Sequence, residues 1–272
     1  MKLFWLSLFV VMSAGCASWH SDRDPSSLAK ALPAPRKPAD GAVLEVSFVS
    51  ILPDDSGDDI WESIDETVVP AEERRALRRN GLRIGKPHKV IDFQKRLERL
   101  RRRPSSEAME TVDVQSELTH QSRRITFRVG KRYELPVRQP ATEDRSVLVT
   151  LGDRPIGRTL SRMQPLFAIR ATSIDVHAIR LSLRPEIQYG DLRQTWVGND
   201  AALRMENRRE SWVFDELATD VELEQGALLV AGSVTPAVGL GQHLFRGLTA
   251  EGDDDHVLMV IRVADLPRIA TP

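Results

Sequence analysis

The fold class of this chain is set by residues 125–137, which read ITFRVGKRYELPV. Apolar and polar residues alternate on both sides of Gly130-Lys131, from Ile125 to Val129 and again from Tyr133 to Val137. Alternation with a period of two is typical of a half-buried β-strand, and two such runs joined by a glycine turn predict a hairpin. The stretch therefore predicts antiparallel β-structure.

The same pattern continues toward the C-terminus. Residues 147–151, 166–171, 174–183, 213–223, 227–233 and 257–263 extend the β pattern. Together they predict a mainly antiparallel β domain over residues 108–268. The segment 239–243 (GLGQH) is too short for a dinucleotide-binding fingerprint, and no helical pattern follows it. We expect its glycines to lie in a loop between strands.

The N-terminal half has a different pattern. Residues 43–52 predict a buried strand and residues 82–85 a short returning strand. Between them, residues 71–80 follow Pro70 and precede Gly81, as expected of a helix, while Trp61, Ile64 and Val68 share one helical face. Residues 88–103, before Pro104, predict a further helix. The sequence thus predicts a small α/β unit at residues 43–103 and an α+β chain overall.

Composition and charge limit the classes of protein to which this chain could belong. The chain has 272 residues, a hydrophobic fraction of 41%, a charged fraction of 28% and a formal net charge of −1. Without its first residues it keeps roughly 230, enough for a substantial hydrophobic core. A net charge near zero steers the protein neither to nucleic acid nor to an anionic surface, so we expect no nucleic-acid partner.

The first residues predict an exported protein. Lys2 precedes an apolar run at residues 3–12, which is about half the length of a membrane-spanning helix, and small residues then lead to Cys16, the chain's single cysteine. Ser13-Ala14-Gly15-Cys16 resembles the lipobox of bacterial lipoproteins, with serine where leucine is usual. The resemblance implies a signal peptide at residues 1–15, fatty acylation such as palmitate on Cys16, and a membrane anchor. Residues 16–42 are rich in proline and polar residues and predict a flexible tether.

The residue after Cys16 and two further family resemblances add to the prediction of an envelope lipoprotein. Residue 17 is alanine rather than the aspartate of inner-membrane lipoproteins, so the lipoprotein resemblance implies the outer membrane, facing the periplasm. Much of the chain is similar to uncharacterised envelope lipoproteins of planctomycete-type bacteria, at residues 46–85, 164–170, 184–186, 194–198, 213–217 and 239–245. Residues 179–186, 221–232 and 257–263 resemble the core of the secretins, the outer-membrane secretion rings.

Few residues suggest catalysis or metal binding. Asp253, Asp255 and His256 offer oxygen and imidazole ligands, but neighbouring residues of an extended chain point in opposite directions, so we expect a solvated hairpin tip. Asp54, Asp55, Asp58 and Asp59 lack the spacing of an EF-hand. No serine-hydrolase elbow, zinc-protease motif or phosphate-binding loop is present. We therefore assign no catalytic residue and no cofactor.

Two tryptophans and one histidine are candidates for a partner or ligand surface. Trp196 and Trp212 flank a polar stretch containing arginines, although tryptophans that end strands are often core residues. His243 is the histidine best suited to a site. Basic residues at 95–103 form a helix end that suits the helix dipole, and they also suit an anionic lipid or an acidic partner.

These observations favour a non-catalytic structural or assembly protein of the cell envelope, which is anchored by lipid and binds another envelope protein. An enzyme stays open as an alternative, either a hydrolase or a glycan-processing enzyme that pairs His243 with an acidic neighbour. A third alternative is a ligand or metal carrier built around Asp253 and His256.

The lipid anchor gives a direct test. Because the thiol of Cys16 is the expected acylation site, Cys16→Ser should release the protein from membranes or block its maturation. Cell fractionation followed by immunoblotting measures both effects. Unchanged membrane partition of the variant would contradict acylation.

Overall fold

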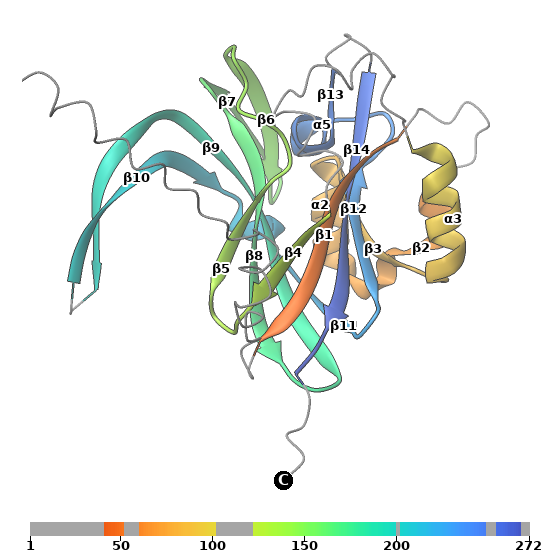
Figure 1. The fold of residues 1–272 in the computed structure, drawn as a ribbon. Coiled ribbons are helices and arrows are strands. Elements are labelled where there is room, and N and C mark those ends of the chain that lie inside the picture. Colours follow the sequence, from red (N-terminus) through yellow and green to blue (C-terminus); the bar gives the residue numbers. More distant parts are fainter. Residues whose placement is uncertain (1–40, 52–59, 102–121, 200–201, 249–253, 268–272) are drawn as a thin grey trace, which may run out of the picture. The chain divides into compact units, whose positions relative to one another are not determined.

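The computed structural model describes residues 41–51, 60–101, 122–199, 202–248 and 254–267. Their strands form three antiparallel sheets (Figure 1). The seven-stranded sheet has the order β2-β3-β12-β14-β1-β4, with β13 beside β14. The five-stranded sheet has the order β10-β9-β8-β5, with β11 beside β9, and β6 and β7 form a hairpin. The mainly antiparallel β-structure expected over residues 108–268 is confirmed in the described part of that range, which begins at residue 122.

The strands of the seven-stranded sheet are β1 (Ala42–Ile51), β2 (Ile64–Asp65), β3 (Leu82–Pro87), β4 (Arg123–Phe127), β12 (Leu228–Ser233), β13 (Arg246–Leu248) and β14 (Asp254–Asp265). Those of the other two sheets are β5 (Arg132–Pro136), β8 (Gln164–Ile174), β9 (Ala178–Asn199), β10 (Ala202–Val213) and β11 (Thr219–Glu224), and then β6 (Arg145–Leu151) and β7 (Arg154–Leu160).

The helices are short. They are α2 (Ala71–Arg79), α3 (Val90–Leu100) and α5 (Gly239–Phe245), with 3-10 turns η2 (Ile60–Ser63), η3 (Glu66–Val68) and η5 (Asp215–Leu217). Among the described residues, no helix combines the length and the hydropathy needed to cross a membrane.

The seven-stranded sheet is buried on both faces. On β14, Met259 and Ile261 join the main core with residues of the five-stranded sheet, whereas Leu258 and Val260 belong to a second core that contains Phe93 of α3. A strand segment covered on both faces is expected to be apolar at successive positions, as residues 228–231 of β12 and 257–261 of β14 are. This explains why residues 257–261 of β14 form an unbroken apolar run, which ends at the exposed Arg262.

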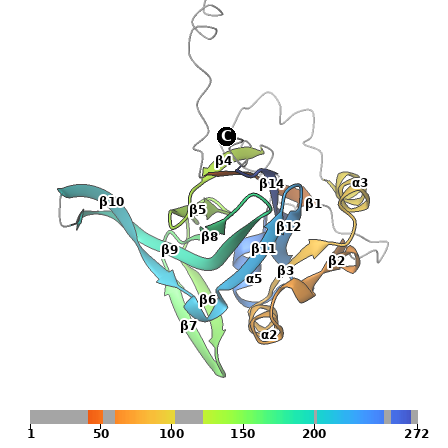
Figure 2. The same ribbon diagram turned by 90° about the horizontal axis from the view of Figure 1, so that it is seen from below.

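The N-terminal strands have no sheet of their own. β1 pairs with β14 over nearly its whole length, and β3 pairs with β12, so strands from both ends of the described chain are interleaved (Figure 2). The expected separate α/β unit at residues 43–103 is therefore not distinct from the β region. The reason is that the central strands of the sheet, β12 and β14, come from the C-terminal half.

The hairpin expected at residues 125–137 does not form. β4 pairs with β1, and β5 pairs with β8. Gly130, with a φ of 77°, turns the chain from one sheet to the other instead of joining two paired strands. Periodicity gave the strands correctly, but the partner of each strand depends on long-range packing.

The helix predictions at residues 71–80 and 88–103 are confirmed as α2 and α3, with slightly different ends. The expected helical face of Trp61, Ile64 and Val68 is replaced by η2, the short strand β2 and η3. The segment 239–243, expected to be a loop, begins helix α5, whose Leu240, Leu244 and Phe245 lie in the main core.

Asn80 links three elements at the C-terminal end of α2. Its side chain is 1% exposed. The amide nitrogen donates to the carbonyls of Ala76 and Thr150, at 2.9 and 2.8 Å, and the amide oxygen accepts from the backbone N–H of Thr150 at 2.7 Å. The backbone carbonyl of Asn80 also accepts from Gly241 in α5. One buried residue thus joins α2, α5 and β6, through its side-chain amide and its backbone carbonyl.

Glycines allow the backbones beside Asn80 to approach closely. A Cβ placed on Gly241 would lie 1.9 Å from the carbonyl oxygen of Gly81, and one on Gly81 would lie 1.9 Å from that of Val238. Gly81 also has a φ of 79°, a conformation that glycine adopts at little cost. These positions need glycine for contact between segments far apart in the sequence.

A buried carboxylate joins α2 to the sheet. Glu66 is 7% exposed and accepts hydrogen bonds from Arg78 and Arg83. Arg83 also stacks on Trp61, with its guanidinium carbon 4.5 Å from the ring centroid. Burial acts to raise the pKa of Glu66, but the hydrogen bonds and positive charges of the two arginines outweigh it and hold that pKa below its ordinary value.

We predict that Asn80→Ala destabilises the fold by about 2–4 kcal/mol, because it removes three side-chain hydrogen bonds, two to the backbone of Thr150 and one to the carbonyl of Ala76. The midpoint of thermal unfolding should fall by roughly 5–12 °C. Arg79→Ala is the matched control. It removes an exposed ion pair with Asp153 and should change stability by less than about 1 kcal/mol. Equal effects of the two substitutions would contradict the linking role of Asn80.

We also predict a pH-dependent effect of Glu66→Gln. Because the folded-state pKa of Glu66 is lowered, its ionised form stabilises the fold at pH values above the unfolded-state pKa of about 4.5. That contribution is lost as the pH falls through the folded-state pKa. Urea unfolding should show wild type more stable by about 2–4 kcal/mol at pH 7, with the difference shrinking below pH 4.5. Glu222→Gln, at an exposed ion pair with Arg180, should show no such trend.

Candidate functional site

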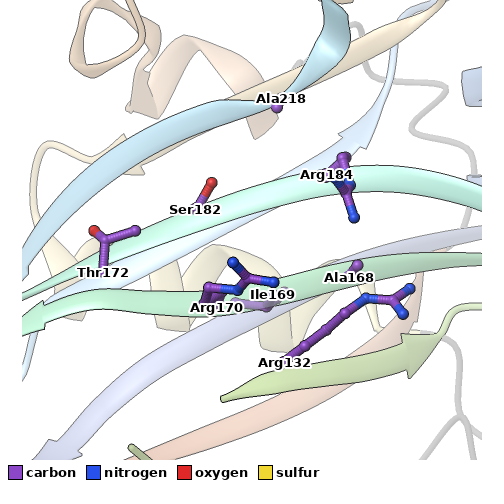
Figure 3. A pocket seen from close by; sticks show the side chains of 8 residues that line it. All are labelled: Arg132, Ala168, Ile169, Arg170, Thr172, Ser182, Arg184 and Ala218. Atoms are coloured by element: carbon purple, nitrogen blue, oxygen red, sulfur yellow. The ribbon is translucent and has the colours of Figure 1, made fainter. Parts of the chain in front are cut away.

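A partly open cleft of about 150 Å³ lies on the five-stranded sheet, on the face away from the main core. Its walls come from β5, β8 and β9 and from the residue before β11 (Figure 3). The lining residues are Arg132, Ala168, Ile169, Arg170, Thr172, Ser182, Arg184 and Ala218. Side chains on the outer face of three neighbouring strands thus converge on a site with three arginines.

The register of the sheet positions these arginines. Arg132 on β5 lies directly opposite Arg170 on β8, and Arg184 on β9 lies opposite Ala168. Residues at alternate strand positions share a face, so Arg170 and Ala168 point to the same side. The small Ala168 leaves room between the longer arginines, as Figure 3 shows.

Glu186 fixes two of the three arginines. Its side chain is 0% exposed and forms ion pairs with Arg132 and Arg184. Arg132 also pairs with Glu134 at 2.9 Å, and Arg184 with Asp215 at 2.7 Å. These contacts hold both guanidinium groups in place beside the cleft.

Arg170 differs from the other two arginines. Its side chain is exposed and makes no hydrogen bond or ion pair with any residue of the described part of the chain. Like charges directly opposite on neighbouring strands destabilise a sheet, and Arg170 faces Arg132. A negatively charged group in the cleft would relieve this repulsion.

The chemistry of the cleft suits binding rather than proton transfer. A guanidinium group stays protonated at all physiological pH values and offers several N–H donors in a planar array. It therefore recognises carboxylates and phosphates by paired hydrogen bonds and does not act as a general acid or base. The cleft is best described as a candidate anion-binding site.

β9 and β10 continue as a two-stranded ribbon beyond the rest of their sheet (Figure 1). The pairing of β8 with β9 ends at Gln164 and Gln188, while β9 and β10 remain paired as far as Asn199 and Ala202. Leu192 and Met205 on the ribbon are 63% and 50% exposed. The ribbon is thus a second surface available to a partner.

Two of the metal candidates, Asp255 and His256, lie in the described part of the chain, and both contact other protein groups. The carboxylate of Asp255, which is 6% exposed, accepts hydrogen bonds from Ser50 and Arg138. His256, which is 8% exposed, lies with Nε2 3.4 Å from the hydroxyl of Ser233. The expected solvated tip is therefore wrong for Asp255 and His256, because β14 already begins at Asp254 and is covered by β1 and β13.

Within the described ranges, no group of three or more His, Cys, Asp or Glu side chains is arranged to hold a metal ion. Asp253 lies outside the described residues, as do the acidic residues 54, 55, 58 and 59. Cys16, its signal peptide and the tether also lie outside them.

The candidate partner residues have different surroundings. Trp212 is 8% exposed, with its ring 4.8 Å from that of Phe214 and the guanidinium of Arg158 stacked 4.6 Å above it. This is a core position, the environment that the sequence also allowed for a tryptophan at the end of a strand. Trp196 belongs to β9 and is paired in register with Met205 in the ribbon.

His243 lies in α5 and is half-buried against β6. Burial and the positive charge of Arg145 lower its pKa, partly offset by a backbone hydrogen bond involving Ser146. Within the described part of the chain, no carboxylate contributes to this shift. The acidic neighbour required by the enzyme alternative is therefore not found beside His243 there.

Sequence reasoning did not identify the arginine cleft. Arg132, Arg170, Arg184 and Glu186 are separated by up to 54 positions and come from strands whose pairing cannot be deduced from periodicity. The available signal was a polar residue at every second position of residues 180–186, three of the four being charged, which marks an outward face of the strand.

Comparison with protein family models, with curated proteins and with solved structures finds no match to this chain. Its function is therefore inferred from the geometry of its own residues.

Proposed function

We propose that this protein is a lipid-anchored, non-catalytic assembly component of the cell envelope, and that it holds an acidic segment of another envelope protein in the arginine cleft. The observation that carries the proposal is Arg170, an exposed cation without a partner in the described chain and directly opposite Arg132. The expected acylation of Cys16 would place the protein at the envelope, on the outer membrane facing the periplasm.

An acidic peptide segment fits the shape and the charge of the cleft. The volume of about 150 Å³ suits one or two carboxylate side chains rather than a large ligand. Arg132 and Arg184 are already oriented by Glu186, so they can add charge and hydrogen bonds with little loss of conformational freedom. Ser182 at the same cleft offers a further hydroxyl donor, whereas the hydroxyl of Thr172 donates to the carbonyl of Arg180.

The contacts of Asp255 and His243 support a binding protein over the two alternatives, a ligand or metal carrier and an enzyme. Both oxygens of the Asp255 carboxylate are occupied by protein donors, so that group is poorly placed to carry a ligand or metal. His243 lies beside an arginine, which disfavours the protonated state that a general acid needs. Neither observation favours a hydrolase or a carrier as a second proposal.

The test uses Arg170→Glu and a fluorescein-labelled decapeptide of alternating Asp and Glu. Because the substitution reverses the charge at the cleft, it should weaken peptide binding at least about tenfold, measured by fluorescence anisotropy at low salt. Arg154→Glu makes the same charge change on β7, outside the cleft, and should alter binding by less than about twofold.

Crosslinking in whole cells tests the biological partner. Wild type and Arg154→Glu should capture the same envelope protein, and Arg170→Glu should lose it. Equal peptide binding by all three proteins, or capture that does not depend on Arg170, would contradict the proposed site. Binding to anionic lipid vesicles in place of the peptide would identify a membrane as the occupant and overturn the protein-partner proposal.

A further inference from the structure

β10 presents a long open edge. It is twelve residues long, is the last strand of the five-stranded sheet, and pairs only with β9 among the described strands. Its sequence contains neither proline nor glycine. Natural proteins usually shorten, cover or interrupt such an edge, because its unpaired backbone N–H and C=O groups can pair with another strand. This edge is therefore suited to addition of a strand.

The ribbon that carries this edge has little support of its own. Beyond Gln188, β9 no longer pairs with β8, so the outer part of the arm has two strands in the described structure. An isolated two-stranded ribbon is only marginally stable in water, whereas additional strands make it stable. The exposed side chains of Leu192 and Met205 add apolar area that a neighbour could cover.

The sequence of β10 indicates which kind of strand could pair with its open edge. Charged residues occupy every second position and alternate in sign, as Arg204, Glu206, Arg208 and Glu210. In an antiparallel pair of identical strands centred on Asn207, position 206 lies opposite position 208 of the other copy, and position 204 lies opposite position 210. Each of the four sequence positions then lies opposite a residue of opposite charge, and no other centre on the strand achieves this. Glu210 also forms an ion pair with Arg193 of its own chain at 2.7 Å. Opposite-charge pairs across antiparallel strands are stabilising.

We propose that β10 pairs in antiparallel fashion with β10 of a second copy of this chain, about a two-fold axis at Asn207. The interface is isologous, as in most symmetric dimers, and joins two five-stranded sheets into one continuous sheet. On the opposite face, Met205 lies across from Arg209 of the other copy, whose aliphatic stem can pack on the methionine. The dimer uses the strand edge and leaves the arginine cleft free, so it is independent of the proposed function.

A charge-exchange series tests the pairing in the full chain carrying Cys16→Ser. Glu206→Arg and Arg208→Glu each place like charges opposite one another at two symmetry-related positions. Each should raise the dissociation constant of the dimer at least about tenfold, measured by sedimentation velocity. The double variant E206R/R208E restores opposite charges and should return the constant to within about threefold of the parent. Thermal unfolding midpoints show that the variants remain folded.

A cysteine pair tests the position of the axis in the same background, in which the introduced residue is the chain's single thiol. At the axis, Asn207 faces itself with a Cα separation of about 4.5–5.5 Å, within the range of a disulfide. Asn207→Cys should therefore form a covalent dimer rapidly on mild oxidation. Ser211→Cys is the control, because its two copies would lie roughly 26 Å apart.

Three results of these experiments would overturn the proposed dimer. A parent chain that remains monomeric at 100 µM overturns the proposal, as does a double variant that associates no better than the single variants. Equal crosslinking at positions 207 and 211 also overturns it, because that result would indicate random collision or another register. Failure of the acidic-peptide experiment leaves these measurements unaffected.

Discussion

The fold depends on one close contact, between Asn80-Gly81 at the end of α2 and residues 238–241 at the start of α5. Carbonyl oxygens approach Gly81 and Gly241 so closely that a Cβ on either glycine would clash. The buried amide of Asn80 adds β6 to the same contact. Segments from the first and last thirds of the chain are thereby held together, and α5 contributes Leu240, Leu244 and Phe245 to the core between the two large sheets.

Two buried carboxylates, Glu66 and Glu186, each hold a pair of arginines, but the two ion clusters have different roles. Near α2, Glu66 is enclosed by Arg78 and Arg83, and the cluster serves to hold helix and sheet together. On the outer face of the five-stranded sheet, Glu186 holds Arg132 and Arg184 in a similar way, but Arg170 is added without a carboxylate partner in the described chain. That extra cation turns a structural ion network into a candidate binding site.

Part of this organisation could be predicted. The period-two pattern correctly indicated antiparallel strands over most of the chain, and proline and glycine correctly marked the ends of α2. Strand partners could not be predicted, because the pattern that places residues 125–137 in strands is the same whether they pair together or with β1 and β8. The cleft was missed for the same reason, since its arginines meet only through the register of β5, β8 and β9.

The sequence by itself determined that strands dominate the chain, which of their faces are apolar, and that the net charge is close to zero. These properties follow from local composition and periodicity. The tertiary structure decided that Trp212 is a core residue, that Asp255 is held by Ser50 and Arg138, and that residues 239–245 form a helix. Each of these depends on groups distant in the sequence, because burial and long-range hydrogen bonds override local preference when they contribute more free energy.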